Sequence, residues 1–155
     1  MSSRSGIVKA MSTKVAKLLD GTGDYINNLY GNVSNKVTHF DDITEFPYIS
    51  ITPGPEVRDD KPSNISWSTL TVYIRIYVEN SDDAQGQLES IMTDMETFVD
   101  TNLQLEYLET STSGTRTRNT LTNNIISIST DEGLLDPNAL GEIAVNVQYE
   151  KTRRT

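Results

Sequence analysis

The sequence contains no cysteine and only one histidine among its 155 residues. Without cysteine the protein has no disulfide, no thiolate nucleophile and no cysteine-bound zinc. The single histidine, His39, has no second imidazole with which to build a zinc triad or an HExxH site. We interpret His39 as a structural residue and expect neither a bound metal nor a cofactor.

Long apolar runs are also missing. No stretch approaches the roughly 20 residues that span a bilayer. No continuous apolar segment follows Arg4 and Lys9, as it would in an export signal. We therefore expect a soluble protein that is not exported and has no membrane partner.

Catalytic motifs are absent as well. The sequence has no nucleophile elbow, Walker loop or dinucleotide-binding pattern, and Gly21-Thr22-Gly23 lacks the flanking strand and helix of a phosphate loop. Calcium binding by Asp131, Glu132 and Asp136 would lack the ligand spacing of an EF-hand. The paired carboxylates are adjacent in sequence and lie in polar stretches, where solvation is their ordinary role: Asp41 with Asp42, Asp59 with Asp60, Asp131 with Glu132. We predict that the protein is not an enzyme.

The charge balance is strongly acidic, with 22 acidic against 13 basic residues and a net charge of -9. A field of this sign repels nucleic acid, which argues against a protein that reads DNA grooves. The length predicts one domain spanning residues 1–155, with flexible tails at residues 1–4 and 151–155.

Two segments have helical periodicity. Apolar residues recur at helical spacing over residues 5–19, and Gly21 is placed to end that helix. Lys9, Lys14 and Lys17 lie off the apolar stripe, either as a solvated face or as a contact for an acidic partner. The second helix follows Asp82, and its stripe is Leu88, Ile91, Met92, Met95, Phe98 and Val99. So regular a stripe favours core packing over a methionine-rich binding groove.

The strongest strand pattern covers residues 67–79. One face is apolar throughout, comprising Leu70, Val72, Ile74, Ile76 and Val78. The opposite face carries Trp67, Thr69, Thr71, Tyr73, Arg75 and Tyr77. That second face is either a solvated sheet surface or a protein interface, because tyrosine and arginine are enriched at interfaces.

Shorter patterns surround this strand. We expect strands at residues 36–40 and 46–51, a turn at residues 53–55 (Pro-Gly-Pro) and a polar loop over residues 56–64. The threonine-rich residues 109–120 predict a mobile loop or a protruding hairpin, with Arg116 and Arg118 near its tip. Alternating residues then predict two closing strands. The whole pattern indicates an α+β domain in which two main helices pack on an antiparallel or mixed sheet.

The last third of the chain carries a family resemblance. The segments IISISTDEGLLDP (residues 125–137) and GEIAVNVQY (residues 141–149) resemble the tail terminator, or tail completion, proteins of long-tailed bacteriophages. The strand FPYISI (residues 46–51), the long strand and the helix after Asp82 occur in the order expected of that family. The resemblance extends over about residues 5–149.

This resemblance implies a structural virion protein at the head-proximal end of the tail, assembled in the host cytoplasm. It implies a homo-hexameric ring that caps the tail tube, stops its polymerisation and offers a joining surface to the head connector or head-completion protein. DNA would pass through the ring without sequence-specific binding, and an acidic wall would let it slide. A different connector, such as a head-completion or neck protein, remains an alternative, as does a soluble binding module.

Five residues are our candidates for contacts with neighbouring subunits or with the tail tube. Tyr73, Arg75 and Tyr77 share the polar face of the long strand, and Arg116 and Arg118 lie in the threonine-rich segment.

Overall fold

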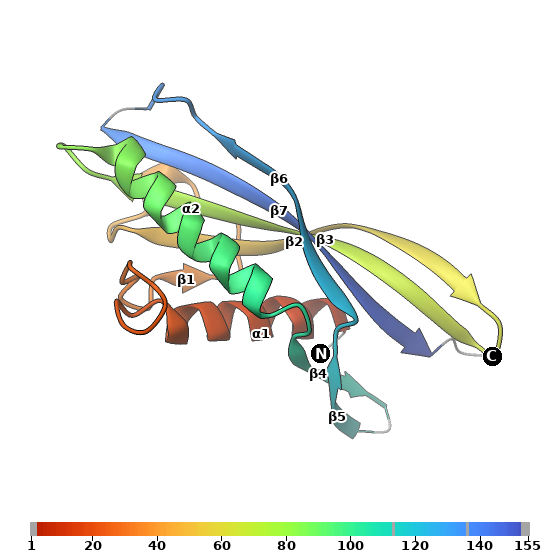
Figure 1. Cartoon of the computed structure of the whole chain (residues 1–155). Coiled ribbons are helices and arrows are strands. Elements are labelled where there is room, and N and C mark those ends of the chain that lie inside the picture. The colour runs from red at the N-terminus through yellow and green to blue at the C-terminus, as the bar shows by residue number, and fades with distance from the viewer. Residues whose placement is uncertain (1–2, 113, 136, 153–155) are drawn as a thin grey trace.

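The computed structural model describes residues 3–112, 114–135 and 137–152. Its main feature is a five-stranded mixed sheet that two helices cover on one face (Figure 1). The strand order is β1-β2-β3-β7-β6; β1 and β2 are parallel and the other neighbours antiparallel. The elements are α1 (Ser3–Leu18), β1 (Val33–Ser34), the 3-10 helix η1 (Phe40–Asp42), β2 (Tyr48–Lys61), β3 (Ile65–Glu79), α2 (Ala84–Thr101), β4 (Glu106–Ser111), β5 (Gly114–Asn119), β6 (Thr122–Thr130) and β7 (Asn138–Thr152). The predicted α+β class is confirmed.

Strand β3 is the centre of the sheet, between β2 and β7. Its predicted apolar face is completely buried beneath the helices, because alternate side chains of a strand point to the same side. At roughly 25 cal/mol per Å² of apolar surface removed from water, this face is a main source of stability. The opposite face, on which neither α1 nor α2 packs, is half-exposed at Thr69, Thr71, Tyr73 and Arg75.

The two helices lie over different halves of the sheet. Helix α1 packs on β1 and β2, whereas α2 packs on β3, β7 and β6. Asp83 caps α2 by accepting a hydrogen bond from the Gly86 amide at 3.0 Å, which satisfies one of the free N–H groups of the first turn. Neither helix of the described ranges is both long enough and apolar enough to span a bilayer.

Some residues of the two expected tails belong to regular elements. Ser3 and Arg4 lie within α1, and Lys151 and Thr152 within β7, where flexible tails were expected. The remaining residues of the expected tails, 1–2 and 153–155, lie outside the described part of the chain.

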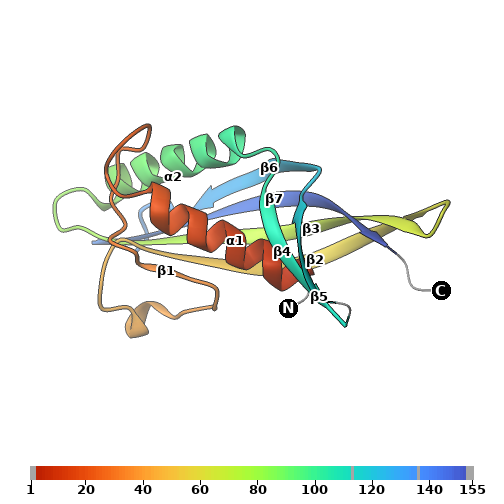
Figure 2. The same ribbon diagram turned by 90° about the horizontal axis from the view of Figure 1, so that it is seen from below.

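The predicted turn at residues 53–55 is wrong, and so is the polar loop that was expected to follow it. Strand β2 continues through Pro53 and Pro55 to Lys61, with a register shift between Pro53 and Glu56. Beyond the two residues paired with β1, the outer edge of β2 has no neighbouring strand in the described sheet, so prolines without N–H groups are tolerated there. A turn at residues 62–64 then leads into β3, and the ribbon extends beyond both helices (Figure 2).

The strand expected at residues 36–40 is also wrong. Only Val33–Ser34 pairs with β2, and the following segment crosses the polar face of the sheet instead. Its carbonyl oxygens are satisfied by side chains: Ser50 donates to Lys36 O at 2.6 Å and Tyr77 donates to Thr38 O at 3.0 Å. Because side chains satisfy this backbone, the segment needs no strand ladder.

The threonine-rich segment forms the protruding hairpin of β4 and β5, one of the two predicted alternatives. Its base packs against the N-terminal half of α1 (Figure 1). Tyr107 of β4 is buried there, with its ring edge-on to Tyr149 of β7 at a centroid distance of 6.4 Å. The hairpin is therefore anchored to the body at one end.

Candidate functional site

The open face of the sheet is the main candidate surface, and Arg75 is at its centre. The Arg75 Nε atom lies 3.0 Å from Glu142 Oε2 on β7, and its Nη1 atom donates to Thr52 Oγ1 on β2 at 3.1 Å. Its guanidinium also lies 5.2 Å from the ring centre of Tyr73. The register places Arg75 directly opposite Glu142. Side chains from β2, β3 and β7 together hold the Arg75 guanidinium in place.

These contacts make the face polar. The Arg75 and Glu142 side chains are 27% and 37% exposed, so water screens the pair and its contribution to stability is below about 1 kcal/mol. Thr71 extends the same polar row by donating to Asn146 Oδ1 at 3.2 Å. We call Thr52, Thr71, Tyr73, Arg75, Glu142 and Asn146 the open sheet face.

Tyr77, the third strand residue that we selected, is not part of this surface. It is only 4% exposed, and its ring packs edge-on against Phe40 at 5.1 Å and near Tyr48 at 5.9 Å. Burial raises the pKa of its hydroxyl. The segment that crosses the sheet covers Tyr77, so this side chain serves the packing of its own chain.

The two arginines of the hairpin share one carboxylate, Glu109, which the sequence analysis did not single out. Arg116 Nη2 lies 3.2 Å and Arg118 Nη1 lies 3.5 Å from Glu109 Oε1, and Ser3 of α1 donates to the other carboxylate oxygen. Burial would raise the pKa of Glu109, but these hydrogen bonds and positive charges outweigh it and hold the pKa below its usual range. Glu109 therefore ties the hairpin to α1.

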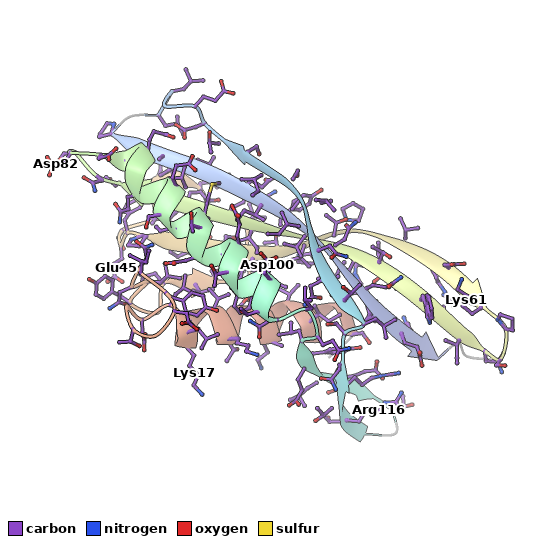
Figure 3. The ribbon with its side chains drawn as sticks, viewed as in Figure 1. Lys17, Glu45, Lys61, Asp82, Asp100 and Arg116 are labelled. Carbon is purple, nitrogen blue, oxygen red and sulfur yellow. The ribbon has the colours of Figure 1, made fainter. Side chains whose placement is uncertain are left out.

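The two arginines differ in what they can offer to a partner. The Arg118 side chain is 18% exposed, whereas that of Arg116 is 61% exposed and lies on the outer part of the hairpin (Figure 3). The antiparallel register of β4 and β5 places Glu109 opposite Arg116. Recognising this register in the sequence would have predicted the ion pair of Glu109 with Arg116. Only Arg116 of this pair presents most of its surface to solvent.

The carboxylates considered for calcium are used within the chain where the structure describes them. Asp131 accepts hydrogen bonds from the Leu135 and Leu140 amides at 3.0 and 3.1 Å and from Gln85 at 2.9 Å. Burial raises its pKa, but the hydrogen bonds outweigh burial and the net shift is downward. Asp136 lies outside the described residues, and no group of three potential metal ligands occurs within them.

The fold defines the chain as an α+β domain in which two helices cover one face of a mixed five-stranded sheet. Its fold is similar to that of a chain from the virion of a native gene transfer agent particle, with a TM-score of 0.57, 11% identity and coverage of 97% of this chain and 96% of that chain. At this identity the likeness shows the fold alone.

The particular family follows from the sequence comparisons. The family model of the Bacteriophage Tail Tube Terminator Protein matches residues 1–155, so the chain belongs to this family. It is 40% identical over 158 residues to tail tube terminator protein p142 of Escherichia phage T5, covering 100% of this chain and 98% of that protein. The protein is thus a structural component of a phage tail and not an enzyme, as the sequence predicted.

Proposed function

We propose that the chain assembles into a closed, homo-hexameric ring on the last ring of the tail tube and so stops tube polymerisation. The observation that carries this proposal is the full-length match to tail tube terminator proteins. A terminator must cover the growing end of a tube made of repeated subunits, and a ring of identical subunits presents one contact surface per tube subunit.

In this proposal the open sheet face and Arg116 contact the tail tube protein. The sheet face combines a tyrosine ring with a positioned arginine, the residue types that dominate interface energetics. Because neighbouring side chains already hold Arg75, binding costs little side-chain entropy. Tyr77 and Arg118 are left out because both side chains are mostly covered within the chain.

We also propose that the ring joins the head and lets DNA pass. The head connector or head-completion protein docks on the side away from the tube, which places the protein at the head-proximal end of the tail after assembly in the host cytoplasm. DNA passes through the central channel without sequence-specific contacts, since a chain of net charge -9 repels phosphates. A head-completion or neck protein would share size and charge but occupy a different position in the particle.

The first prediction concerns the native mass. Light scattering after size exclusion across a concentration series is expected to show a closed species near six times the chain mass of 17.3 kDa. Images of that species on tube ends would test its position. A chain that stays monomeric at every concentration, with tube polymerisation unaffected by its addition, would contradict the ring proposal.

The second prediction concerns the tube contact. Tyr73→Ala and Arg116→Glu are each expected to weaken the capping of purified tubes about tenfold or more, as loss of an interface anchor does, while leaving the native mass unchanged. Tube lengths measured by electron microscopy in a titration with the variant give the readout.

Tyr30→Ala provides the matched control, because Tyr30 is 74% exposed and belongs to the segment between α1 and β1, outside the open sheet face as defined above. If the wild type, Tyr73→Ala and Arg116→Glu cap tubes equally well, the open sheet face and Arg116 do not contact the tube. The ring itself would be unaffected by that result.

A further inference from the structure

The two helices carry opposite charges. Helix α1 contains one arginine and three lysines and no acidic residue, whereas α2 contains four acidic residues and no basic one. In a chain of net charge -9, so complete a separation gives α1 a field opposite to that of the rest of the molecule.

Three charged side chains on each helix are exposed or half-exposed. Lys9 and Lys17 on α1 and Glu89 and Asp100 on α2 are exposed, and Lys14 and Glu96 are half-exposed. Among the ion pairs of the described residues, none involves these six side chains. We call Lys9, Lys14 and Lys17 the basic flank, and Glu89, Glu96 and Asp100 the acidic flank.

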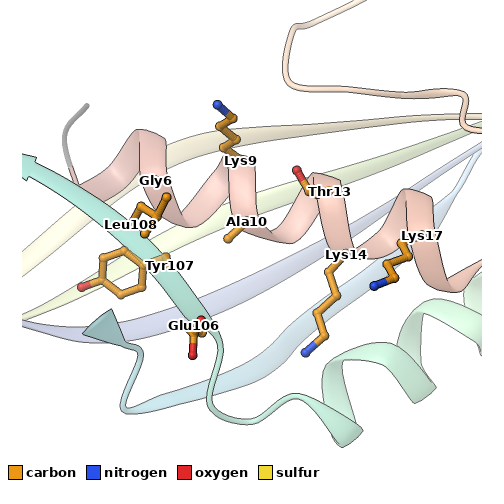
Figure 4. A pocket seen from close by; sticks show the side chains of 9 residues that line it. All are labelled: Gly6, Lys9, Ala10, Thr13, Lys14, Lys17, Glu106, Tyr107 and Leu108. Carbon is orange, nitrogen blue, oxygen red and sulfur yellow. The ribbon is translucent and has the colours of Figure 1, made fainter. Parts of the chain in front are cut away.

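A groove accompanies the basic flank. It lies between α1 and β4, has a volume of about 360 Å³, and is lined by the three lysines together with Ala10, Tyr107 and Leu108 (Figure 4). Lys14 and Lys17 lie on the side of α1 that also faces Glu106, and Lys9 lies on the opposite side (Figure 4). Leu108 leaves 51% of its surface exposed there, so the groove offers apolar surface between positive charges.

The acidic flank lies along one face of α2. Glu89, Glu96 and Asp100 follow at helical spacing on one face of α2, and at about 1.5 Å per residue they span about 16 Å. Lys9 to Lys17 span about 12 Å by the same rise. The other side of α2, around Asp94, is covered by Ile26 and Asn27 of the same chain.

The two helices that carry these flanks lie over opposite halves of the sheet. Helix α1 covers β1 and β2, and α2 covers β3, β7 and β6, in a strand order of β1-β2-β3-β7-β6. In a ring each subunit meets the next through different surfaces, one edge against the opposite edge. Lateral association in this manner brings α1 of one subunit beside α2 of its neighbour.

We propose that the basic flank of α1 in one copy binds the acidic flank of α2 in the next copy, and that this contact sets the direction of assembly around the ring. The inference rests on the proposed ring and names the surface that closes it. A second copy is favoured over nucleic acid because the chain itself provides the complementary charge on α2, whereas its net charge repels phosphates.

Two charge-reversal variants test the contact. Lys9→Glu/Lys14→Glu/Lys17→Glu makes both flanks acidic, and Glu89→Lys/Glu96→Lys/Asp100→Lys makes both basic. Each variant alone is expected to need about 100-fold or more higher concentration to form the ring, because like charges then face each other in every contact. Light scattering and sedimentation give the midpoint concentrations.

Mixing the two variants gives the decisive result. In an equimolar mixture each acidic flank can face a basic one if the variants alternate, so the ring is expected to return to within about threefold of the wild-type midpoint. The single chain that carries all six reversals is expected to assemble likewise. Raising the salt to about 1 M, where the screening length is about 3 Å, should weaken wild-type assembly.

Asp41→Lys/Asp42→Lys/Glu45→Lys is the matched control, because it changes the net charge by as much as the α2 reversal, at exposed positions outside both flanks. It is expected to assemble like the wild type. If each reversal alone forms rings as readily as the wild type, the helix contact is wrong and the ring stands. If the wild type is monomeric at every concentration, the ring proposal fails and the helix contact fails with it.

Discussion

Replacing Gly6 with alanine is expected to lower the free energy of unfolding by about 2–3 kcal/mol, the cost of overpacking at a rigid contact. A Cβ at this position would lie 2.1 Å from the Leu108 carbonyl oxygen and 3.3 Å from its carbon. Both atoms belong to backbone, which a rotamer change cannot move aside. Alanine should separate the β4–β5 hairpin from α1, although in a free helix it would gain about 1 kcal/mol over glycine.

Urea unfolding measures this effect, and hydrogen exchange at Tyr107 and Leu108 reports the release of the hairpin. Gly86→Ala is the matched control in α2. Its Cβ would also lie 2.1 Å from a neighbour, but that neighbour is Asp83 Oδ2, the movable end of a side chain. Loss of the cap and gain of helix propensity should then cancel to within about 1 kcal/mol. Equal destabilisation by both substitutions would contradict our interpretation of Gly6.

Replacing Asp94 with alanine is expected to cost about 3 kcal/mol, because it leaves several partly buried donors without a partner. Asp94 is 2% exposed and accepts hydrogen bonds from the amides of Ile26 and Asn27, at 3.1 and 2.8 Å, and from the Asn27 side chain at 2.8 Å. These bonds hold the loop after α1 against α2. We expect this loop to lose protection from hydrogen exchange before the rest of the chain does.

Thermal and urea unfolding give the magnitude. Asp94→Asn retains one acceptor oxygen and should recover part of the loss. Asp82→Ala removes an exposed carboxylate just before α2 and should change stability by less than about 0.5 kcal/mol. An Asp94→Ala variant as stable as Asp82→Ala would show that the loop is held by other contacts.

The sequence predicted the elements whose evidence lies within one short window. The apolar alternation of β3 and the helical stripe of α2 are both buried as expected. The hairpin of β4 and β5 was one of two alternatives for a threonine-rich segment. The segments at residues 125–137 and 141–149 also resembled the family that the full-length match then established.

Errors arose where a neighbour distant in sequence decides the structure. The Pro-Gly-Pro turn was inferred from the inability of proline to join a central ladder, but β2 has a free outer edge at this point. From the sequence, Tyr77 was predicted to share the available polar face of its strand, but in the structure Phe40 and Tyr48 pack against its ring. Neither outcome can be deduced from local pattern, because strand order is a global property.

By itself, then, the sequence determined the α+β class, the apolar faces of β3 and α2, and the family, because periodicity and local motifs act over a few residues at a time. The tertiary structure alone decided which polar residues remain available to partners. Arg116 and Arg118 pair with the same Glu109, yet only Arg116 remains largely exposed. The placement of α1 and α2 over opposite halves of the sheet separates positive from negative charge. The physical reason is that exposure and pairing depend on side chains brought together from distant parts of the chain.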